Sequence, residues 1–443
     1  MGLAGVLQRR GVWAAALVVA MLLAVPGMVL AQESKPADLA VATTSATTSA
    51  TTVPADSAGA GWPCFRGANR DGISKAPFAW PKNGPKQVWK TAIGGGHSAV
   101  SIGDGRLFTM GNKENVDTVW CLDVNTGKEI WKYSYPCKAR AAGQYDSDGP
   151  GATPTIDGKV VYTLSRRGDL FCFEAQGGKI VWKKNLKEAL NVEIPTWGLV
   201  GSPVVYGKML LLNVGAGGLA LDKANGEVIW KSVGSPGYST PVLFQYEGKT
   251  RLALIADKSL AVVEPDTGKE VWRQDWKTPY EAGAADPIIV DGTVFLSSGY
   301  NFGAGLFKIG ADAASSQIWR DKKVMRNHFH TCMLWEGNLY GIDGDQQDEM
   351  DAPLKCLDMK TGKEKWKHEG LGFGGVMIAG GKLVILTQTG ELVAAELSPE
   401  GYKEIGKAKI IDGKVFTVPV ILNDRLYARN TQGDLVCVSI KGE

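Results

Sequence analysis

Short runs of apolar residues, separated by glycine and other turn-forming residues, recur along the chain from Trp62 onward. One group contains four such runs, at Thr153–Asp157, Val160–Ser165, Asp169–Glu174 and Lys179–Lys183, which together are rich in Val, Ile, Phe and Tyr. Runs of this length and composition, bounded by turn residues, are typical of β-strands. The pattern therefore predicts an antiparallel meander of four strands.

The same group of four strands repeats along the chain. An acidic residue is followed by glycine four positions later and by tryptophan after four more, at Asp123…Gly127…Trp131, Glu174…Gly178…Trp182, Asp222…Gly226…Trp230, Glu264…Gly268…Trp272 and Asp358…Gly362…Trp366. A second unit, an apolar strand ending in a turn, recurs eight times, at Gly105, Gly158, Gly207, Gly248, Gly292, Gly337, Gly381 and Asn423-Asp424. The first and last of these turns are seven repeats apart, so the period is about 46 residues. A four-stranded repeat of this length predicts an all-β fold, an eight-bladed β-propeller of four-stranded antiparallel blades.

One position of the predicted outer strands is an aromatic residue in seven blades, and Ile405 takes the eighth place. The seven residues are Trp89, Trp131, Trp182, Trp230, Trp272, Trp319 and Trp366. The first outer strand, Gln87–Thr91, precedes any inner strand, and the last strand, Asp434–Ile440, is only the third of its blade. We therefore predict that the N-terminal strand completes the last blade and closes the ring, which leaves only short, protected sheet edges.

Residues 1–31 have the pattern of an export signal, with Arg9 and Arg10 before a long apolar run and small residues at its end. The alternative is a retained membrane anchor. However, Pro26-Gly27 interrupts the apolar run before the roughly 20 residues that a spanning helix needs. We therefore expect cleavage, no membrane span in the mature protein, and a periplasmic or extracellular location.

Residues 32–61 are rich in Thr, Ser and Ala and have little to bury, so they predict a flexible linker. Residues 62–86 then form a lead-in to the propeller, which spans 87–443.

Composition narrows the function. Lys and Arg number 49 and Asp and Glu 46, a net charge of only +3, which argues against a nucleic-acid partner. The 56 glycines among 443 residues are nearly twice the average usage of about 7%. The turns of a repetitive β-structure explain this excess, because glycine adopts positive φ without steric cost.

The repeat also carries a resemblance to a known family. Cys121-x-Asp123-x-x-Thr126-Gly127-Lys128-x-x-Trp131 resembles the tryptophan-docking motif of the pyrroloquinoline-quinone (PQQ) repeat family, and Cys356-x-Asp358-x-x-Thr361-Gly362-Lys363-x-x-Trp366 repeats it. The opening Trp62-Pro63-Cys64-Phe65-Arg66-Gly67 is similar to secreted, planctomycete-type propellers of this family. The resemblance implies that the seven tryptophans pack between adjacent blades and have a structural role. Because this fold hosts several functions, it does not by itself identify one.

Two branches of the family imply different functions. Quinoprotein dehydrogenases bind PQQ and Ca²⁺ in the central funnel, and the large enzymes place an adjacent pair of cysteines over the cofactor. None of the seven cysteines here are neighbours. The other branch contains non-catalytic adaptor propellers, such as the outer-membrane assembly lipoprotein. We expect a binding or scaffold module for an envelope protein, peptide or glycan, rather than an enzyme, and we expect it to be a monomer. The alternative is a PQQ- and Ca-dependent alcohol dehydrogenase.

Candidate ligand-binding residues lie where loops gather around a propeller's channel mouth. His97, His328 and His330 stand at the start of predicted innermost strands, where grouped histidines bind metal or merely line a wet channel. Asp146 and Asp148 lie in the first long loop and are either ligands or solvated turn carboxylates. The sequence indicates no catalytic residue and does not identify a metal.

Two aromatic positions complete the set of candidates. Tyr300 and Asn301, in a loop of the fifth blade, could stack on a sugar or peptide or could pack on the next blade. Trp197, in another long loop, has the same two interpretations.

The cysteines fall into two groups. Cys121, Cys172, Cys356 and Cys437 share one third-strand position, where small buried side chains are expected between blades. A pair among Cys64, Cys137 and Cys332 could form a disulfide in an oxidising compartment, and the pairing is not determined by the sequence.

Overall fold

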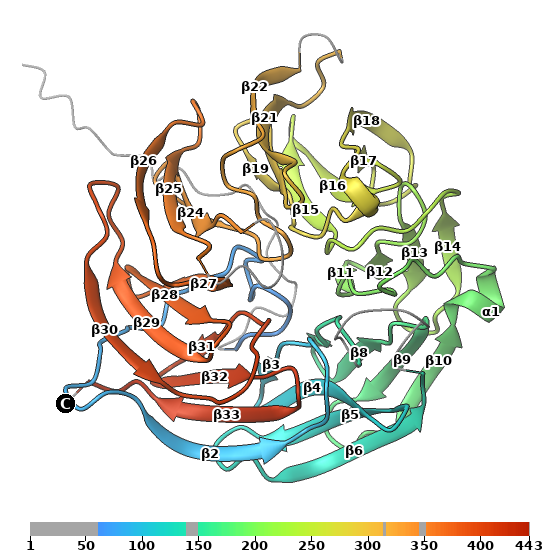
Figure 1. Ribbon diagram of the computed structural model, residues 1–443. Coiled ribbons are helices and arrows are strands. Elements are labelled where there is room, and N and C mark those ends of the chain that lie inside the picture. The colour runs from blue at the N-terminus through green and yellow to red at the C-terminus, as the bar shows by residue number, and fades with distance from the viewer. Residues whose placement is uncertain (1–60, 139–148, 313–315, 345–350, 443) are drawn as a thin grey trace, which may run out of the picture. The chain divides into compact units, whose positions relative to one another are not determined.

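The computed structural model of the protein describes residues 61–138, 149–312, 316–344 and 351–442. All the described residues belong to one compact unit, which lies within Thr47–Glu443. Its strands form eight sheets, seven with four strands and one with five. Figure 1 shows these sheets arranged as blades around a central axis. The predicted eight-bladed, all-β propeller is therefore confirmed.

The expected export signal at 1–31 lies outside the described residues, as does the linker at 32–61 apart from Gly61. Both stay predictions. Within the described ranges, no helix is long and apolar enough to cross a membrane.

The first four blades follow in chain order, each from its innermost to its outermost strand. They are β3 (Ser101–Gly103), β4 (Arg106–Lys113), β5 (Val116–Asp123) and β6 (Glu129–Pro136); β7 (Thr155–Asp157), β8 (Val160–Leu164), β9 (Asp169–Glu174) and β10 (Ile180–Asn185); β11 (Val204–Tyr206), β12 (Met209–Leu212), β13 (Leu219–Asp222) and β14 (Val228–Lys231); and β15 (Val242–Tyr246), β16 (Lys249–Ala256), β17 (Ser259–Val263) and β18 (Glu270–Asp275). The strands of blade 2 agree with the predicted ones to within two residues at each end.

Blades 5 to 8 are built in the same way. They are β19 (Ile288–Val290), β20 (Thr293–Ser298), β21 (Gly303–Lys308) and β22 (Gln317–Asp321); β23 (Met333–Trp335), β24 (Asn338–Ile342), β25 (Leu354–Asp358) and β26 (Glu364–His368); β27 (Gly374–Ala379), β28 (Lys382–Thr387), β29 (Glu391–Glu396) and β30 (Glu404–Lys409); and β31 (Val420–Leu422), β32 (Arg425–Arg429), β33 (Asp434–Ser439) and β2 (Lys86–Ala92). A short helix α1 (Leu186–Leu190) follows blade 2, and a 3₁₀ turn η1 (Pro279–Glu281) precedes blade 5.

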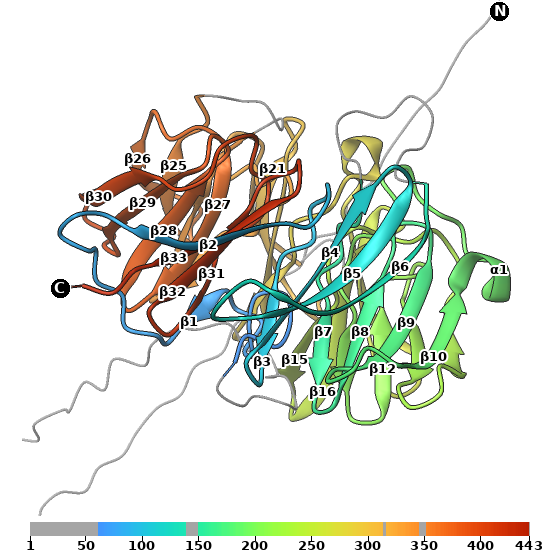
Figure 2. The same cartoon turned by 90° about the horizontal axis from the view of Figure 1, so that it is seen from below.

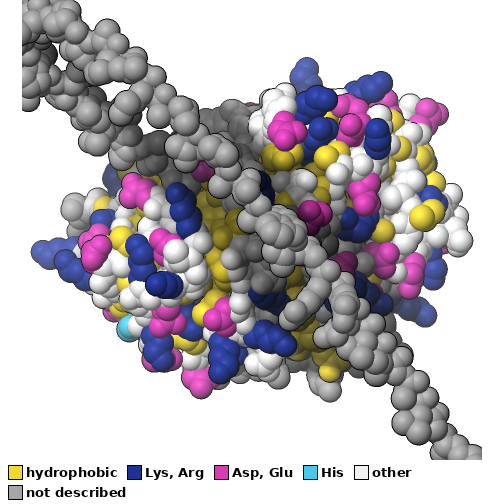
Figure 3. All heavy atoms as spheres, turned by 90° about the horizontal axis from the view of Figure 1, so that it is seen from above, with side chains coloured by type: hydrophobic (Ala, Val, Ile, Leu, Met, Phe, Trp, Pro, Cys, Tyr) yellow, Lys and Arg dark blue, Asp and Glu magenta, His cyan; other side chains and the backbone are white. Residues whose placement is uncertain are grey.

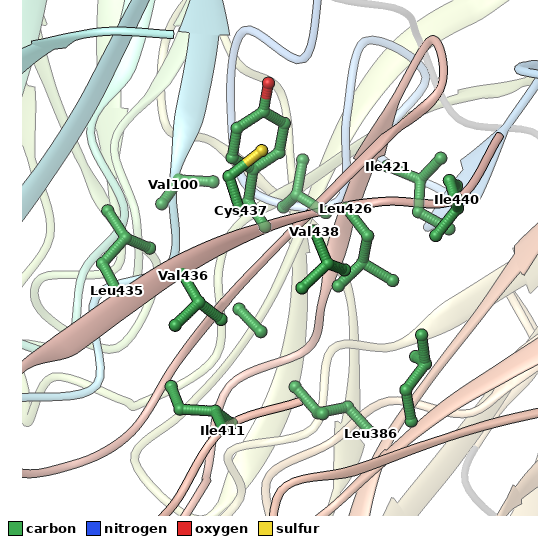
Figure 4. Packing of buried hydrophobic residues seen from close by; sticks show 14 of the residues in the cluster. Val100, Leu386, Ile411, Ile421, Leu426, Leu435, Val436, Cys437, Val438 and Ile440 are labelled. Atoms are coloured by element: carbon green, nitrogen blue, oxygen red, sulfur yellow. The ribbon is translucent and has the colours of Figure 1, made fainter. Parts of the chain in front are cut away.

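The N-terminal strand closes the ring, as predicted. Strand β2 pairs antiparallel with β33, so Trp89 lies opposite Cys437. A large cluster of buried apolar residues joins this closing strand to blades 1, 7 and 8. Figure 4 shows part of this cluster, where Leu426 lies beside Val438, its partner in the sheet. Burial of so much apolar surface stabilises the junction between the two ends of the chain.

Each of the seven repeat tryptophans lies against the following blade. Its indole N–H donates a hydrogen bond of 2.8–3.2 Å to a backbone carbonyl there, with Val124, Ala175, Lys223, Pro265, Ala311, Met359 and Ser398 as acceptors in turn. The turn glycine provides the space. A Cβ on Gly127, for example, would lie 2.5 Å from the ring of Trp89. The regular spacing of the repeat thus places each tryptophan where it joins one blade to the next.

The junction between blades 7 and 8 is built differently. The predicted Ile405 does not take the tryptophan's place, because Gly406 pairs with Ala394 as Trp182 pairs with Cys172 in blade 2. Trp80 of the lead-in packs on this glycine, where a Cβ would lie 2.3 Å from the indole. A tryptophan from outside the repeat therefore fills the place that the repeat leaves open.

The third-strand cysteines lie opposite the tryptophans of their own blades, as in the pairs Cys121–Trp131 and Cys172–Trp182. All seven cysteines are buried and unbridged. The disulfide that the sequence left open among Cys64, Cys137 and Cys332 is therefore not formed.

Candidate functional site

The lead-in segment, the blue chain near the centre of Figure 1, crosses one end of the channel. Its strand β1 (Ile73–Ser74) pairs in parallel with β27, and Trp62 pairs with Ile102 in blade 1. Three hydrogen bonds reach blades 2, 3 and 8: Ile156 N to Pro63 O at 2.8 Å, Arg70 Nη2 to Val205 O at 3.1 Å and Ser74 Oγ to Ile421 O at 3.0 Å. Figure 2 shows β1 at the lower edge of the blades. The lead-in therefore closes this end.

Beyond the lead-in lies a cavity of about 760 Å³, to which the lead-in contributes Phe65. Seven of the eight blades supply described residues to its lining, mostly from the loops that enter the innermost strands. Ligand pockets usually measure about 300–1,000 Å³. The channel is thus a cavity of ligand-binding size with one end sealed.

The structure brings five of the predicted site residues together. His97, His328, His330, Trp197 and Tyr300 all line the cavity, although they come from four different blades and their connecting loops. Asn301 is next to Tyr300 but is not among the lining residues. The predicted Asp146 and Asp148 lie outside the described residues. That these side chains bind a ligand stays a prediction.

Sequence reasoning missed several lining residues, among them Arg166, Tyr238, Tyr280, Asp286 and Phe416. Of these residues, only Asp286 has a sequence pattern that could have identified it. The residue two positions before the innermost strand is small or carries a hydroxyl in blades 1 to 4 and 6, where it is Ala99, Thr153, Ser202, Thr240 and Thr331. A carboxylate stands out in that series.

These equivalent residues form a belt around the channel, defined by Ala99, Thr153, Ser202, Thr240, Asp286 and Thr331. In each step, a backbone N–H donates to the side-chain oxygen of the next blade. The five bonds measure 3.2, 2.9, 3.1, 2.8 and 2.7 Å from Ala99 N to Thr331 Oγ1. The belt therefore links blades 1 to 6 to one another and satisfies five backbone donors at the cavity wall.

Burial keeps His97 and His330 neutral. Burial and, secondarily, the charges of Arg166 and Arg429 hold the pKa of His97 well below its ordinary value. Burial also lowers the pKa of His330 to about 4, although its Nε2 lies 2.9 Å from Phe416 O. Asp286 behaves in the opposite sense, since burial raises the pKa of its carboxyl to about 6. At neutral pH both imidazoles therefore act as uncharged hydrogen-bonding groups.

A family model described as outer membrane protein assembly factor BamB matches residues 138–368, just over half of the chain. The chain belongs to this family.

Individual members and relatives agree with that assignment. The outer membrane protein assembly factor BamB of Yersinia pestis is 20% identical over 394 residues, covering 83% of this chain and 82% of the relative. Tetrathionate hydrolase of Acidithiobacillus ferrooxidans is 24% identical over 238 residues, and the chain spans less than half of that relative's length, 44%.

A solved structure shows the shared fold. The europium-containing methanol dehydrogenase superposes with a TM-score of 0.65 at 12% identity, covering 86% of this chain and 98% of that structure.

The dehydrogenase branch raises the question of whether these residues fit PQQ and Ca²⁺. Calcium takes six to eight oxygen ligands, with carboxylates prominent among them. In the described part of the cavity wall, Asp286 is the one carboxylate, and its Oδ1 already accepts the Thr240 N–H at 2.8 Å. No group of three or more His, Cys, Asp or Glu in the described residues is placed to hold a metal. The described residues do not fit a calcium-bound quinone, and we derive no reaction step through one.

Proposed function

We propose that the protein is an exported binding or scaffold module of the cell envelope, which holds part of a protein, peptide or glycan in its channel. The observation that carries this proposal is the sealed, aromatic-lined cavity. A recess with one open end and a wall fixed by the belt is preorganised, which lowers the entropy cost of binding.

The charges on the outer surface do not favour a partner of one charge sign. On the face shown in Figure 3, basic and acidic side chains are interspersed. The family's named members are outer membrane assembly factors, which is consistent with an envelope partner. We propose a periplasmic or extracellular monomer on the same grounds.

Site-specific photo-crosslinking tests this function. We would replace Tyr300, which lines the cavity, with p-benzoylphenylalanine and irradiate the full-length protein with the envelope fraction of its native cells. The matched control carries the same group at Tyr402, which stacks on His368 at 3.7 Å outside the cavity lining. An adduct at position 300 that is absent at position 402 supports the proposal. No adduct at 300, or identical adducts at both positions, contradicts it.

The alternative, a PQQ- and Ca-dependent dehydrogenase, predicts a different result. Purified protein incubated with PQQ and Ca²⁺ would elute with quinone absorbance and would reduce a dye in the presence of alcohols. Stoichiometric quinone with turnover would replace our proposal by this one. We expect neither signal, because the described cavity wall has too few oxygen ligands for the metal.

A further inference from the structure

Two tyrosines form a lip at the edge of the cavity, beside blade 5. Tyr280 lies in the loop that enters this blade and Tyr300 in its β20–β21 loop, and their rings meet edge to face with centroids 5.1 Å apart. Both lie in the left-handed region, with φ of 56° and 57°. This conformation costs a residue other than glycine about 1–2 kcal/mol, and such strain clusters at ligand-binding sites.

The lip is held in place from below. The guanidinium of Arg320 lies 4.4 Å from the ring centres of both Trp276 and Phe302. Trp276 begins the loop that contains Tyr280, and Phe302 ends the loop that contains Tyr300. Arg320 also donates to Ala304 O at 2.9 Å and to Phe302 O at 2.6 Å. The two loops therefore share one cation–π anchor, which fixes the tyrosines before any ligand arrives.

Tyr280 is nonetheless exposed over 73% of its surface, a high value for an aromatic side chain in so ordered a place. Its ring packs little of its area against the protein. Because the fold pays a conformational cost to present an exposed ring, the ring has a use other than packing.

From the lip a continuous series of ring contacts leads into the cavity. Tyr300 meets His328 at 4.6 Å, and His328 meets Phe329 at 5.1 Å. Phe329 contacts Phe416 at 5.3 Å, and Phe416 contacts His97 at 5.6 Å. We call this series of rings, Tyr300, His328, Phe329, Phe416 and His97, the track. The track crosses blades 5, 6, 8 and 1, so a long, linear ligand could follow it from the mouth to the far wall.

The polar groups beside the track suit hydroxyl groups. His97 Nε2 is buried without a hydrogen-bond partner in the described residues. In a neutral imidazole this nitrogen either donates or accepts, depending on the tautomer, and a hydroxyl group can match either role. The two charged residues of the described lining, Arg166 and Asp286, have opposite signs, so the lining itself has no net charge. Two further cations lie beside it, since Arg429 acts on His97 and Lys414 lies 4.6 Å from the ring centre of Phe416.

An extended peptide is disfavoured by the backbone of the same wall. Peptides that add to a sheet edge need unpaired main-chain donors. The belt already occupies those of Thr153, Ser202, Thr240 and Asp286, and the lead-in pairs with the inner edge of blade 7. Recognition must therefore come from side chains, which here are aromatic faces and neutral polar groups.

We propose that the cavity binds a linear, uncharged oligosaccharide, with sugar rings stacked along the track from the Tyr280–Tyr300 lip and hydroxyl groups bonded to His97. This inference rests on the proposed binding function and names its ligand class. The electron-rich faces of the aromatic rings attract the polarised C–H groups of a pyranose.

The test uses the labelled full-length protein on an array of neutral and acidic glycans, followed by calorimetry with the neutral hexasaccharides of glucose and N-acetylglucosamine. Tyr280→Asn and Tyr300→Asn remove the rings but keep a residue that tolerates positive φ, so folding is preserved. We expect binding of at least one neutral glycan, and at least a tenfold loss of affinity in the double variant. His97→Ala should also weaken binding, and Tyr402→Asn, the matched control, should stay within twofold.

The outcomes separate this inference from the proposed function. Three results would overturn the oligosaccharide proposal: binding to acidic glycans alone, no glycan binding, or binding that the lip variants leave unchanged. If one of these results occurs and a protein or peptide is still crosslinked at position 300, the proposed binding function holds with a different ligand. Failure of both experiments would remove both proposals.

Discussion

Two sets of aromatic residues in this protein show opposite behaviour. The repeat tryptophans are mostly buried, occupy one repeat position and donate each indole N–H to the next blade. The lip tyrosines, Tyr280 and Tyr300, have no counterpart in the repeat, lie in a strained backbone conformation and expose ring surface. Periodic aromatics therefore hold the ring together, whereas the two lip tyrosines, which stand outside the period, mark the candidate site.

The difference has an energetic basis. A docked tryptophan lowers the free energy of the fold through burial and one hydrogen bond, so selection for stability can maintain it. A strained, exposed tyrosine raises that free energy and is kept only if something else requires it. Substitutions can test this division directly.

The largest effect is expected from a docking tryptophan. Trp182 is 9% exposed and its Nε1 donates to Lys223 O at 2.9 Å. Trp182→Ala should cost about 3–5 kcal/mol of unfolding free energy in a urea titration, and Trp182→Phe about 1–2 kcal/mol, mainly for the lost hydrogen bond. Crosslinking at position 300 should be unchanged under conditions where the variant is folded. A loss below about 1 kcal/mol for Trp182→Ala would show that the docking does not stabilise the ring.

A pair of glycines in blade 3 separates backbone strain from tryptophan docking. Gly226 has φ of 74°, and a Cβ there would lie 2.8 Å from the Trp182 ring; Gly207 has φ of 54° with open space around it. Gly207→Ala should cost about 1–2 kcal/mol through strain alone. Gly226→Ala should cost about 2–4 kcal/mol, because it also displaces the indole. Equal losses in thermal or urea unfolding would mean that the indole moves aside without cost.

The same contrast explains what the sequence could predict. The blades, the closing strand and the seven repeat tryptophans follow a period of local patterns, so one chain sufficed to identify them. The lip was harder, because Tyr280 becomes part of a site only when two loops meet over Arg320. His97, His328 and His330 were found because their places in the repeat put them at the channel. Trp80 was missed because it fills a repeat position from outside the repeat.

Asp286 is the belt residue that departs from the period, and its effect should depend on pH. Burial raises the pKa of its carboxyl to about 6 from an ordinary value near 3.8. The folded protein therefore holds this proton more tightly than the unfolded chain, and stability should fall as pH rises from about 4 to 6.

Asp286→Thr restores a hydroxyl that can accept the Thr240 N–H. The rise in the pKa from 3.8 to about 6 corresponds to about 3 kcal/mol at most. We therefore expect a gain of about 1–3 kcal/mol at pH 8 and little or none at pH 4. Urea titrations at both values measure it. A gain that is the same at both pH values would show that the carboxyl does not titrate in this window.

The smallest effect on stability is expected at the lip itself. In Tyr280→Gly, relief of left-handed strain should gain about 1–2 kcal/mol, while the greater freedom of glycine in the unfolded chain should cost about 0.5–1 kcal/mol. Because the ring is 73% exposed, little packing is lost, and the unfolding free energy should stay within about 1 kcal/mol of the parent. A loss above about 2 kcal/mol would place Tyr280 with the structural aromatics. An unchanged stability, combined with weaker ligand binding, would mean that the fold keeps this tyrosine for its ligand.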